Sequence, residues 1–334
     1  MRKTAYVVLA MLLAASMLLT ACGTKATEAP VVTEAPVVVA PTAAPVAWGT
    51  VDHPIVMAMA PSATQEQLST GGAAIAAELK KLTGYEITVT IPNSYAALVE
   101  AMGSGNAQIG WLPPLVYMLA QYKGFADVGL VTLRSGSDTY GVQFSANAAS
   151  GFTSYFDTAT NKTTTDDAKT ALAQFEGKKP CWTDPLSASG YVVPFAFLSQ
   201  AGIKTKQAAF VIGHPTVITA LYAGGICDFG ATYIDARTSI KDPPADLNDK
   251  VVVIWRTPNF IPNDNVSFAK DLPADVRAKL IEALMTMSSS DEGKAILKSA
   301  GYQIEGLKAV DDTFYDSFKA YLESTGLDIT TLVK

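Results

Sequence analysis

Two short loops near the middle of the chain carry residue types that bind oxyanions without a metal. Segment 184–190, Asp-Pro-Leu-Ser-Ala-Ser-Gly, places the hydroxyls of Ser187 and Ser189 and free backbone amides at the start of a predicted helix. Because the amides and the dipole at a helix start favour negative charge, this loop is a candidate oxyanion site that needs no cation. The alternative is that Ser187 only caps the helix, a role that requires no ligand.

The second loop, 213–216, places a histidine at another predicted helix start. His214 is one of only two histidines in the chain, and its ring nitrogen can donate a hydrogen bond to an oxyanion. A capping or surface role is the alternative. The other histidine, His53, precedes the first predicted strand, and we expect it to be exposed and without a role.

Two carboxylates and one tyrosine also follow predicted strands. Asp235 and Asp264 are candidates to hold a cationic group on a ligand, the alternative being that they pair with Arg237 or Arg256. Tyr95 begins the helix after the second predicted strand, where it either points into a cleft or packs in the core.

Strands and helices alternate through the part of the chain that positions these residues. Apolar alternation and helical spacing predict a first group of elements at 55–60, 65–82, 86–91, 95–103, 108–112 and 115–122. A second group is predicted at 178–183, 189–201, 209–212, 216–223 and 227–232. The alternation favours mainly parallel sheets flanked by helices, and in such sheets ligands bind beyond the carboxyl ends of the strands.

The two groups predict an α/β protein of two lobes with its ligand in the cleft between them. Strands at 128–133 and 141–146 lie between the two groups in the chain, and residues from 273 onward are helical. We therefore expect one lobe from 53–141 together with 255–334, a second lobe from 142–254, and two crossing hinge strands.

The N-terminus is typical of an exported lipoprotein. Residues 1–21 hold Arg2 and Lys3, a short apolar run and small residues before Cys22, which resembles a bacterial lipobox. We expect cleavage before Cys22, acylation of that cysteine and attachment to the outer face of the cell membrane. A membrane-spanning helix is the alternative, but the run is shorter than the roughly 18 residues this needs. Residues 22–52 repeat Thr-Glu-Ala-Pro-Val-Val and predict an extended tether.

Composition narrows the remaining function classes. The chain has 334 residues, a net charge of −6 and no cluster of Lys and Arg after residue 3, which argues against a nucleic-acid partner. It contains no nucleophile elbow and no metal-ligand spacing, so we expect neither an enzyme, nor a metal, nor a cofactor. Cys181 and Cys227 fall in predicted strands, and both a disulfide and two buried thiols remain open.

Several motifs in order resemble the phosphonate and phosphite substrate-binding proteins of ABC importers. They are segments 94–102, 109–114 and 184–190, then Gly213-His214 and Pro262-Asn263-Asp264. The resemblance spans about residues 55–301 and implies the type II periplasmic-binding fold, in which two lobes close on a ligand. It implies a monomer that delivers a small oxyanion to an ABC permease.

The resemblance also assigns roles to residues of this chain. It implies that Ser187, Ala188, Ser189 and His214 hold phosphonyl oxygens, and that Tyr95 lines the pocket. In members that bind aminoalkylphosphonates, acidic residues matching Asp235 and Asp264 receive the amine. Three departures stand out: Ala188 replaces a frequent threonine, Tyr140 matches a usual aromatic with an offset of one residue, and Gly224-Gly225 adds a residue. A type II binding protein or sensor for another small organic or amine-containing nutrient is the alternative function.

Overall fold

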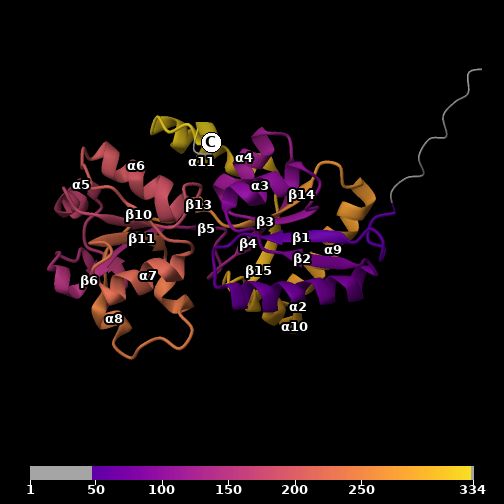
Figure 1. Cartoon of the computed structure of the whole chain (residues 1–334), viewed down its shortest axis with the longest axis horizontal. Helices are drawn as coiled ribbons and strands as arrows, with labels where there is room; N and C mark the ends of the chain where they lie inside the picture. The colour runs from indigo at the N-terminus through magenta and orange to yellow at the C-terminus, as the bar shows by residue number, and fades with distance from the viewer. Residues whose placement is uncertain (1–46, 332–334) are drawn as a thin grey trace, which may run out of the picture. The chain divides into compact units, whose positions relative to one another are not determined.

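The apolar residues of the first predicted strand place it inside a six-stranded sheet of the first lobe (Figure 1). The computed structural model describes residues 47–331, and the N-terminal leader, Cys22 and most of the tether lie outside them. The strand order is β15-β4-β14-β3-β1-β2. Its strands are β1 (Ile55–Met59), β2 (Ile87–Thr90), β3 (Ile109–Leu112), β4 (Ala126–Leu133), β14 (Asn265–Ala269) and β15 (Gly306–Ala309).

Local sequence explains the helices that cover this sheet. Thr64 and Gln67 form a capping box at the start of α2, and Gly84 ends that helix in the left-handed conformation. Ser94 caps α3 through the backbone amide of Ala97. The helices are α2 (Gln65–Thr83), α3 (Tyr95–Gly103), α4 (Pro114–Tyr122), α9 (Ala274–Ser289) and α10 (Asp291–Ser299).

The second lobe contains a five-stranded sheet of order β10-β9-β11-β6-β12 and a small β7–β8 hairpin. Its strands are β6 (Val142–Asn147), β7 (Phe156–Asp157), β8 (Lys162–Thr163), β9 (Pro180–Trp182), β10 (Ala209–Phe210), β11 (Phe229–Tyr233) and β12 (Val251–Arg256). Its helices are α5 (Ala168–Leu172), α6 (Val193–Gln200), α7 (His214–Ala223) and α8 (Leu247–Lys250).

Both large sheets are mixed rather than mainly parallel. In the first, β1 pairs in parallel with β2 and β3, whereas β14 runs antiparallel to β3 and β4. In the second, β9 pairs in parallel with β10 and β11, whereas β6 runs antiparallel to β11 and β12. The expectation of mainly parallel sheets was wrong because β6 and β14, the strands that follow the two crossings between the lobes, run opposite to both of their neighbours, as the edge strand β15 does to β4.

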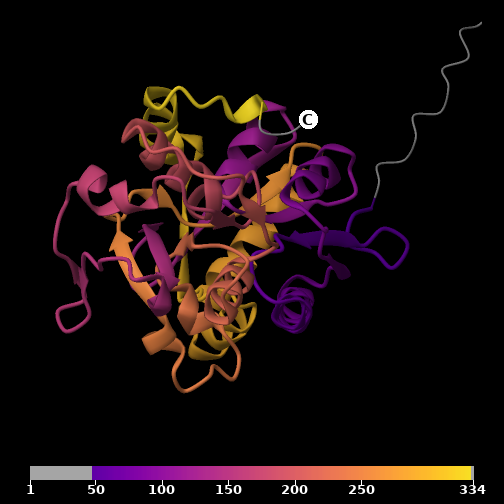
Figure 2. The ribbon, with the colours of Figure 1, turned by 60° about the vertical axis from the view of Figure 1, so that its left-hand side comes forward.

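The two crossings pair with each other. β5 (Thr139–Tyr140) and β13 (Ile261–Pro262) form a two-stranded antiparallel ribbon between the lobes. Trp255 and Arg256 belong to β12 and pair with β6 in the second sheet. The last helix, α11 (Asp316–Ser324), lies above this region, between α6 and α4, in the view of Figure 1. Figure 2 shows the two sheets from a second direction.

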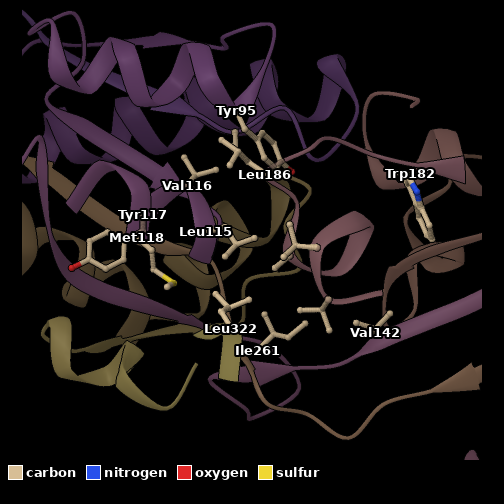
Figure 3. Packing of buried hydrophobic residues seen from close by; sticks show 14 of the residues in the cluster. Tyr95, Leu115, Val116, Tyr117, Met118, Val142, Trp182, Leu186, Ile261 and Leu322 are labelled. Atoms are coloured by element: carbon tan, nitrogen blue, oxygen red, sulfur yellow. The ribbon is translucent and has the colours of Figure 1, made fainter. Parts of the chain in front are cut away.

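A continuous apolar cluster supports both lobes at the hinge. Figure 3 shows Tyr95 of the first lobe beside Leu186 of the second, within a cluster that also contains the buried residues of α4 and, further along, Val142. Phe175 and Phe229 stack with ring centroids 3.9 Å apart within the second lobe. Because these side chains are almost fully buried, the cluster fixes the loops that emerge from it toward the cleft.

Cys181 and Cys227 form a disulfide in the second lobe, with their Cα atoms 5.6 Å apart. The bond links β9 to the loop before β11. Of the two alternatives that the sequence left open, a disulfide or two buried thiols, the structure therefore has the disulfide. Within residues 47–331, none of the helices combines the length and hydrophobicity needed to cross a bilayer.

Candidate functional site

A small cavity lies where loops of the two lobes meet. It encloses about 20 Å³. One water molecule needs about 10–15 Å³ of such space, so the cavity has room for one or two waters. Most of its walls are the segments that follow strands or begin helices, as expected for an α/β sheet. It is lined by Ser62, Tyr95, Pro113, Arg134, Tyr140, Ser187, Ala188, His214, Tyr233, Asp264, Gly301 and Tyr302.

The loop after β9 presents a helix start to this cavity. The backbone turns through one π-helical turn, Ala188–Val192, before α6, and Ser187 caps it by accepting a hydrogen bond of 3.1 Å from the Gly190 amide. A Cβ atom on Gly190 would lie 2.0 Å from the Thr183 hydroxyl oxygen, so only glycine fits there. The first amides of a helix have no partner within it, and those after Ser187 are therefore donors at the cavity wall.

Ser189 follows the cavity-lining residue Ala188 and carries a buried hydroxyl, although Ser189 is not itself among the residues that line the cavity. Its Oγ has no hydrogen-bond partner among residues 47–331. The hydroxyl lies near the phenol of Tyr140. Burial and, to a smaller extent, the charge of Asp264 raise the pKa of Tyr140, and the Ser189 hydroxyl offsets part of that rise. A buried hydroxyl without a partner costs about 1–3 kcal/mol, so Ser189 is prepared for a partner that the protein itself does not supply.

His214 occupies the first position of α7, after Gly213, whose positive φ of 84° favours glycine. Its ring lies 4.6 Å from the ring of Tyr233, and its Nδ1 has no hydrogen-bond partner within the described part of the chain. Burial, assisted by the nearby charge of Arg134, lowers the pKa of His214 to about 3. The ring is therefore neutral at physiological pH and offers one nitrogen that donates and one that accepts.

Arg134 supplies a cation that the sequence analysis did not expect in this site. The residue follows β4 and forms a largely buried ion pair with Asp264. Burial would lower the pKa of Arg134, but Asp264, together with Tyr140 and Tyr233, outweighs this effect and the pKa is raised, so the guanidinium stays charged. Asp264 thus neutralises a guanidinium in the structure rather than facing the cavity as a free carboxylate.

Asp235 lies outside the cavity wall. Its carboxylate accepts hydrogen bonds from Arg237 and from Arg256, the latter at 2.9 Å, and also from Gln143. Burial would raise the pKa of Asp235, but Arg237, through its charge and hydrogen bonds, and Gln143 outweigh this effect and the pKa is lowered. The pairing with both arginines was the alternative considered for this residue.

Polar contacts also join the two lobes directly. The Tyr95 amide donates to the Asp184 carboxylate at 3.4 Å, and Lys241 pairs with Glu66 at 2.7 Å. Gln303 of the first lobe donates to the hydroxyl of Thr238 in the second at 2.9 Å. These contacts hold the lobes together over the cavity, which explains its small volume.

Six of the eight expected site residues line the cavity, namely Tyr95, Tyr140, Ser187, Ala188, His214 and Asp264. Sequence reasoning missed four polar side chains of the wall, which are Ser62, Arg134, Tyr233 and Tyr302. Ser62, Arg134 and Tyr233 follow or end strands, so the strand-end rule that selected Ser187 and His214 applies to them as well. Tyr302 follows a helix and carries no such signal. Within residues 47–331, no group of three or more His, Cys, Asp or Glu side chains is arranged to hold a metal.

Comparison with known proteins agrees with this geometry. The family described as periplasmic substrate-binding proteins of phosphonate ABC transporters matches residues 57–315. The phosphate-import protein PhnD of Mycolicibacterium smegmatis is 24% identical over 296 residues, covering 81% of this chain and 86% of that protein.

Two solved structures share the fold. The binding protein component of an ABC phosphonate transporter from Pseudomonas aeruginosa has a TM-score of 0.68 and 18% identity, covering 81% of this chain and 87% of that one. PhnD1 from Prochlorococcus marinus, in complex with methylphosphonate, has a TM-score of 0.70 and 17% identity, covering 81% and 98%. The predicted two-lobed type II periplasmic-binding fold is confirmed.

Proposed function

Because this chain belongs to the family of periplasmic substrate-binding proteins of phosphonate ABC transporters, we propose that its cleft captures a small phosphorus oxyanion for a permease. The class comprises phosphonates with a small substituent, phosphite and phosphate. The observation that carries the proposal is the pair of buried groups at two helix starts, Ser189 Oγ and His214 Nδ1, which lack partners within residues 47–331.

The cavity recognises an anion mainly through neutral donors. The donors we propose are the backbone amides after Ser187, the Ser189 hydroxyl and one nitrogen of His214, all from the second lobe, and a hydrogen bond to a charged oxygen is worth about 1.5–3 kcal/mol. Arg134 adds a positive charge from the first lobe, balanced by Asp264. Closing the lobes on the ligand removes water from these bonds and strengthens them.

The cavity also limits the size of the ligand. Its volume of about 20 Å³ holds one or two water molecules, so even a ligand of the size of phosphate or methylphosphonate requires the lobes to part slightly from their positions in this structure, and larger ligands are disfavoured. The names of two relatives, a phosphate-import protein and a complex with methylphosphonate, concern ligands of this size. Both carboxylates considered for a ligand amine are paired with arginines. We therefore leave Asp235 out of the proposed ligand contacts, and the proposed role of Asp264 is to hold Arg134 in place.

A lipid anchor completes the proposal. Cys22, after a leader ending in small residues, becomes the acylated first residue of the mature chain, and the Pro-rich tether holds the body at the outer face of the membrane. Mass spectrometry of the N-terminal peptide tests this: a diacylated Cys22 is expected, and an unmodified peptide retaining residues before Cys22 would contradict it. Cys22→Ser should release the protein from the membrane fraction.

A ligand panel tests the proposed function. Methylphosphonate, phosphite, phosphate, sulfate, 2-aminoethylphosphonate and a set of amino acids, as amine-bearing nutrients without phosphorus, are added to the full chain, and binding is measured by calorimetry and thermal stability. At least one phosphorus oxyanion should bind, and Ser189→Ala should weaken it. Stabilisation by an amine-bearing nutrient without phosphorus, with none by any phosphorus oxyanion, would favour the alternative of a binding protein or sensor for another nutrient.

A further inference from the structure

A second, larger cavity adjoins the proposed oxyanion site on its hinge side. It encloses about 380 Å³ and shares three walls with the first cavity, the side chains of Arg134, Tyr140 and Tyr233. The remaining walls come from the turn after Arg134, the β7–β8 hairpin and the segment between β12 and β13. They are Ser135, Thr139, Phe156, Asn161, Thr163, Ile234, Arg256, Thr257, Asn259 and Gln303.

The charge of this hinge-side cavity is positive. Among the described residues that line it, Arg134 and Arg256 are charged and no carboxylate is present. Asp235, behind the wall, is shared between Arg256 and Arg237, and Asp264 balances Arg134. Three guanidinium groups therefore stand against two carboxylates, which leaves one positive charge in excess around the cavity.

The arginines also retain hydrogen-bonding capacity there. Arg256 is buried against Phe156, with its guanidinium carbon 4.1 Å from the ring centroid, and it donates to Gln143, Asn161 and Asp235. A guanidinium has five N–H donors, so these contacts leave donors over. Arg134 Nε, at the wall common to both cavities, is buried and has no hydrogen-bond partner among residues 47–331.

From this geometry we infer that the hinge-side cavity is a second subsite, which takes a carboxylate carried on a short substituent of the ligand. The inference rests on the proposed function, since the phosphonyl group of the same ligand occupies the first cavity. A carboxylate matches the planar donors of arginine, and an ammonium group would meet the excess positive charge. The preferred ligands are thus phosphonocarboxylates rather than aminoalkylphosphonates.

Charge variants at the rim of the hinge-side cavity test the inference without disturbing its buried arginines. The exposed Asn259 lines the cavity, and the exposed Asn248 lies elsewhere on the second lobe and serves as the matched control. The measured quantity is the ratio of the dissociation constants of propylphosphonate and 3-phosphonopropionate, which differ in the terminal carboxylate. The ratio should exceed about ten in the wild type, since about 1.4 kcal/mol is tenfold.

Asn259→Asp should reduce this ratio about two- to fivefold and Asn259→Lys should raise it by a similar factor, as expected for one added charge at a partly exposed position. The same substitutions at Asn248 should leave it unchanged. Arg256→Met should abolish the carboxylate preference while methylphosphonate still binds. If Arg256→Met does not fold, the Asn259 variants decide.

The outcomes separate this inference from the proposed function. Tight methylphosphonate binding with a ratio near one, or with tighter binding of 2-aminoethylphosphonate than of 3-phosphonopropionate, overturns the subsite and leaves the proposed function standing. Equal effects at Asn259 and Asn248 also overturn it. Absence of binding by every phosphonate overturns both.

Discussion

Replacing His214 with phenylalanine should remove a specific pH dependence of stability. Burial lowers the pKa of His214 from 6.5 to about 3, so the folded protein keeps the ring neutral where the unfolded chain protonates it. Between these two values the unfolded state binds the additional proton, and the wild type loses stability as the pH falls below about 6.5. Above that pH the ring is neutral in both the folded and the unfolded state, and the stability of the wild type is not reduced by His214.

The size of this effect follows from the shift. At about pH 5, some one and a half units below the unfolded pKa, the ring costs the folded state about 2 kcal/mol at 1.36 kcal/mol per unit. His214→Phe keeps a ring beside Tyr233 and has no nitrogen to titrate, so its stability relative to the wild type should rise by about 2 kcal/mol between pH 7.5 and pH 5. Effects of all other titrating groups cancel in this difference.

Urea unfolding of both proteins at the two pH values, in buffer free of phosphate, measures the difference. His53→Gln is the matched control, because His53 is the other histidine and is exposed, and its curves should parallel those of the wild type. Parallel behaviour of His214→Phe and the wild type across this range would refute the buried, neutral state of His214. The same variant should bind methylphosphonate about ten- to a hundredfold more weakly, because it loses one bond to a charged oxygen.

Other substitutions probe the remaining groups of the site. Ser187→Ala should lower the free energy of unfolding by about 1 kcal/mol, because the hydrogen bond from the Gly190 amide to the cap is lost. Ser189→Ala should leave the free energy of unfolding equal or higher, and it should weaken methylphosphonate binding about tenfold or more. Wild-type affinity for methylphosphonate in Ser189→Ala would contradict this. Asp264→Asn should improve the binding of sulfate relative to methylphosphonate about tenfold. The reason is that the Asp264 carboxylate repels sulfate, which has no proton to donate to it. An unchanged ratio of the two dissociation constants would contradict this. Reduction of the Cys181–Cys227 bond, which closes a loop of sequence separation 46, should lower the free energy of unfolding by about 4 kcal/mol, and an unchanged urea midpoint with dithiothreitol would be inconsistent with the bond.

The two oxyanion loops were predictable because their signals are local. The hydroxyls around Ala188 and the position of His214 each follow a strand and begin a helix, and both facts are legible within a few residues. The fold of two α/β lobes follows from the same kind of local signal repeated along the chain. The helices of the first lobe accordingly begin and end close to their predicted limits.

The residues that sequence reasoning missed depend on contacts distant in the chain. Tyr302 reaches the cavity because its hydroxyl donates to the Ala60 carbonyl, 242 residues earlier. Arg134 pairs with Asp264 across 130 residues, and no local pattern announces that a free carboxylate will be neutralised. The same holds for β14, whose short apolar run gives no indication that it inserts between β3 and β4. These features arise from the crossing of the chain between lobes.

Calorimetric titration of the full chain with methylphosphonate, phosphite and phosphate, repeated on Ser189→Ala and His214→Phe, tests the central claim most directly. We expect saturable binding of at least one of these oxyanions at one site, weakened about tenfold or more by each substitution while both variants remain folded. No heat of binding with any of the three, or binding that both variants retain in full, would contradict it.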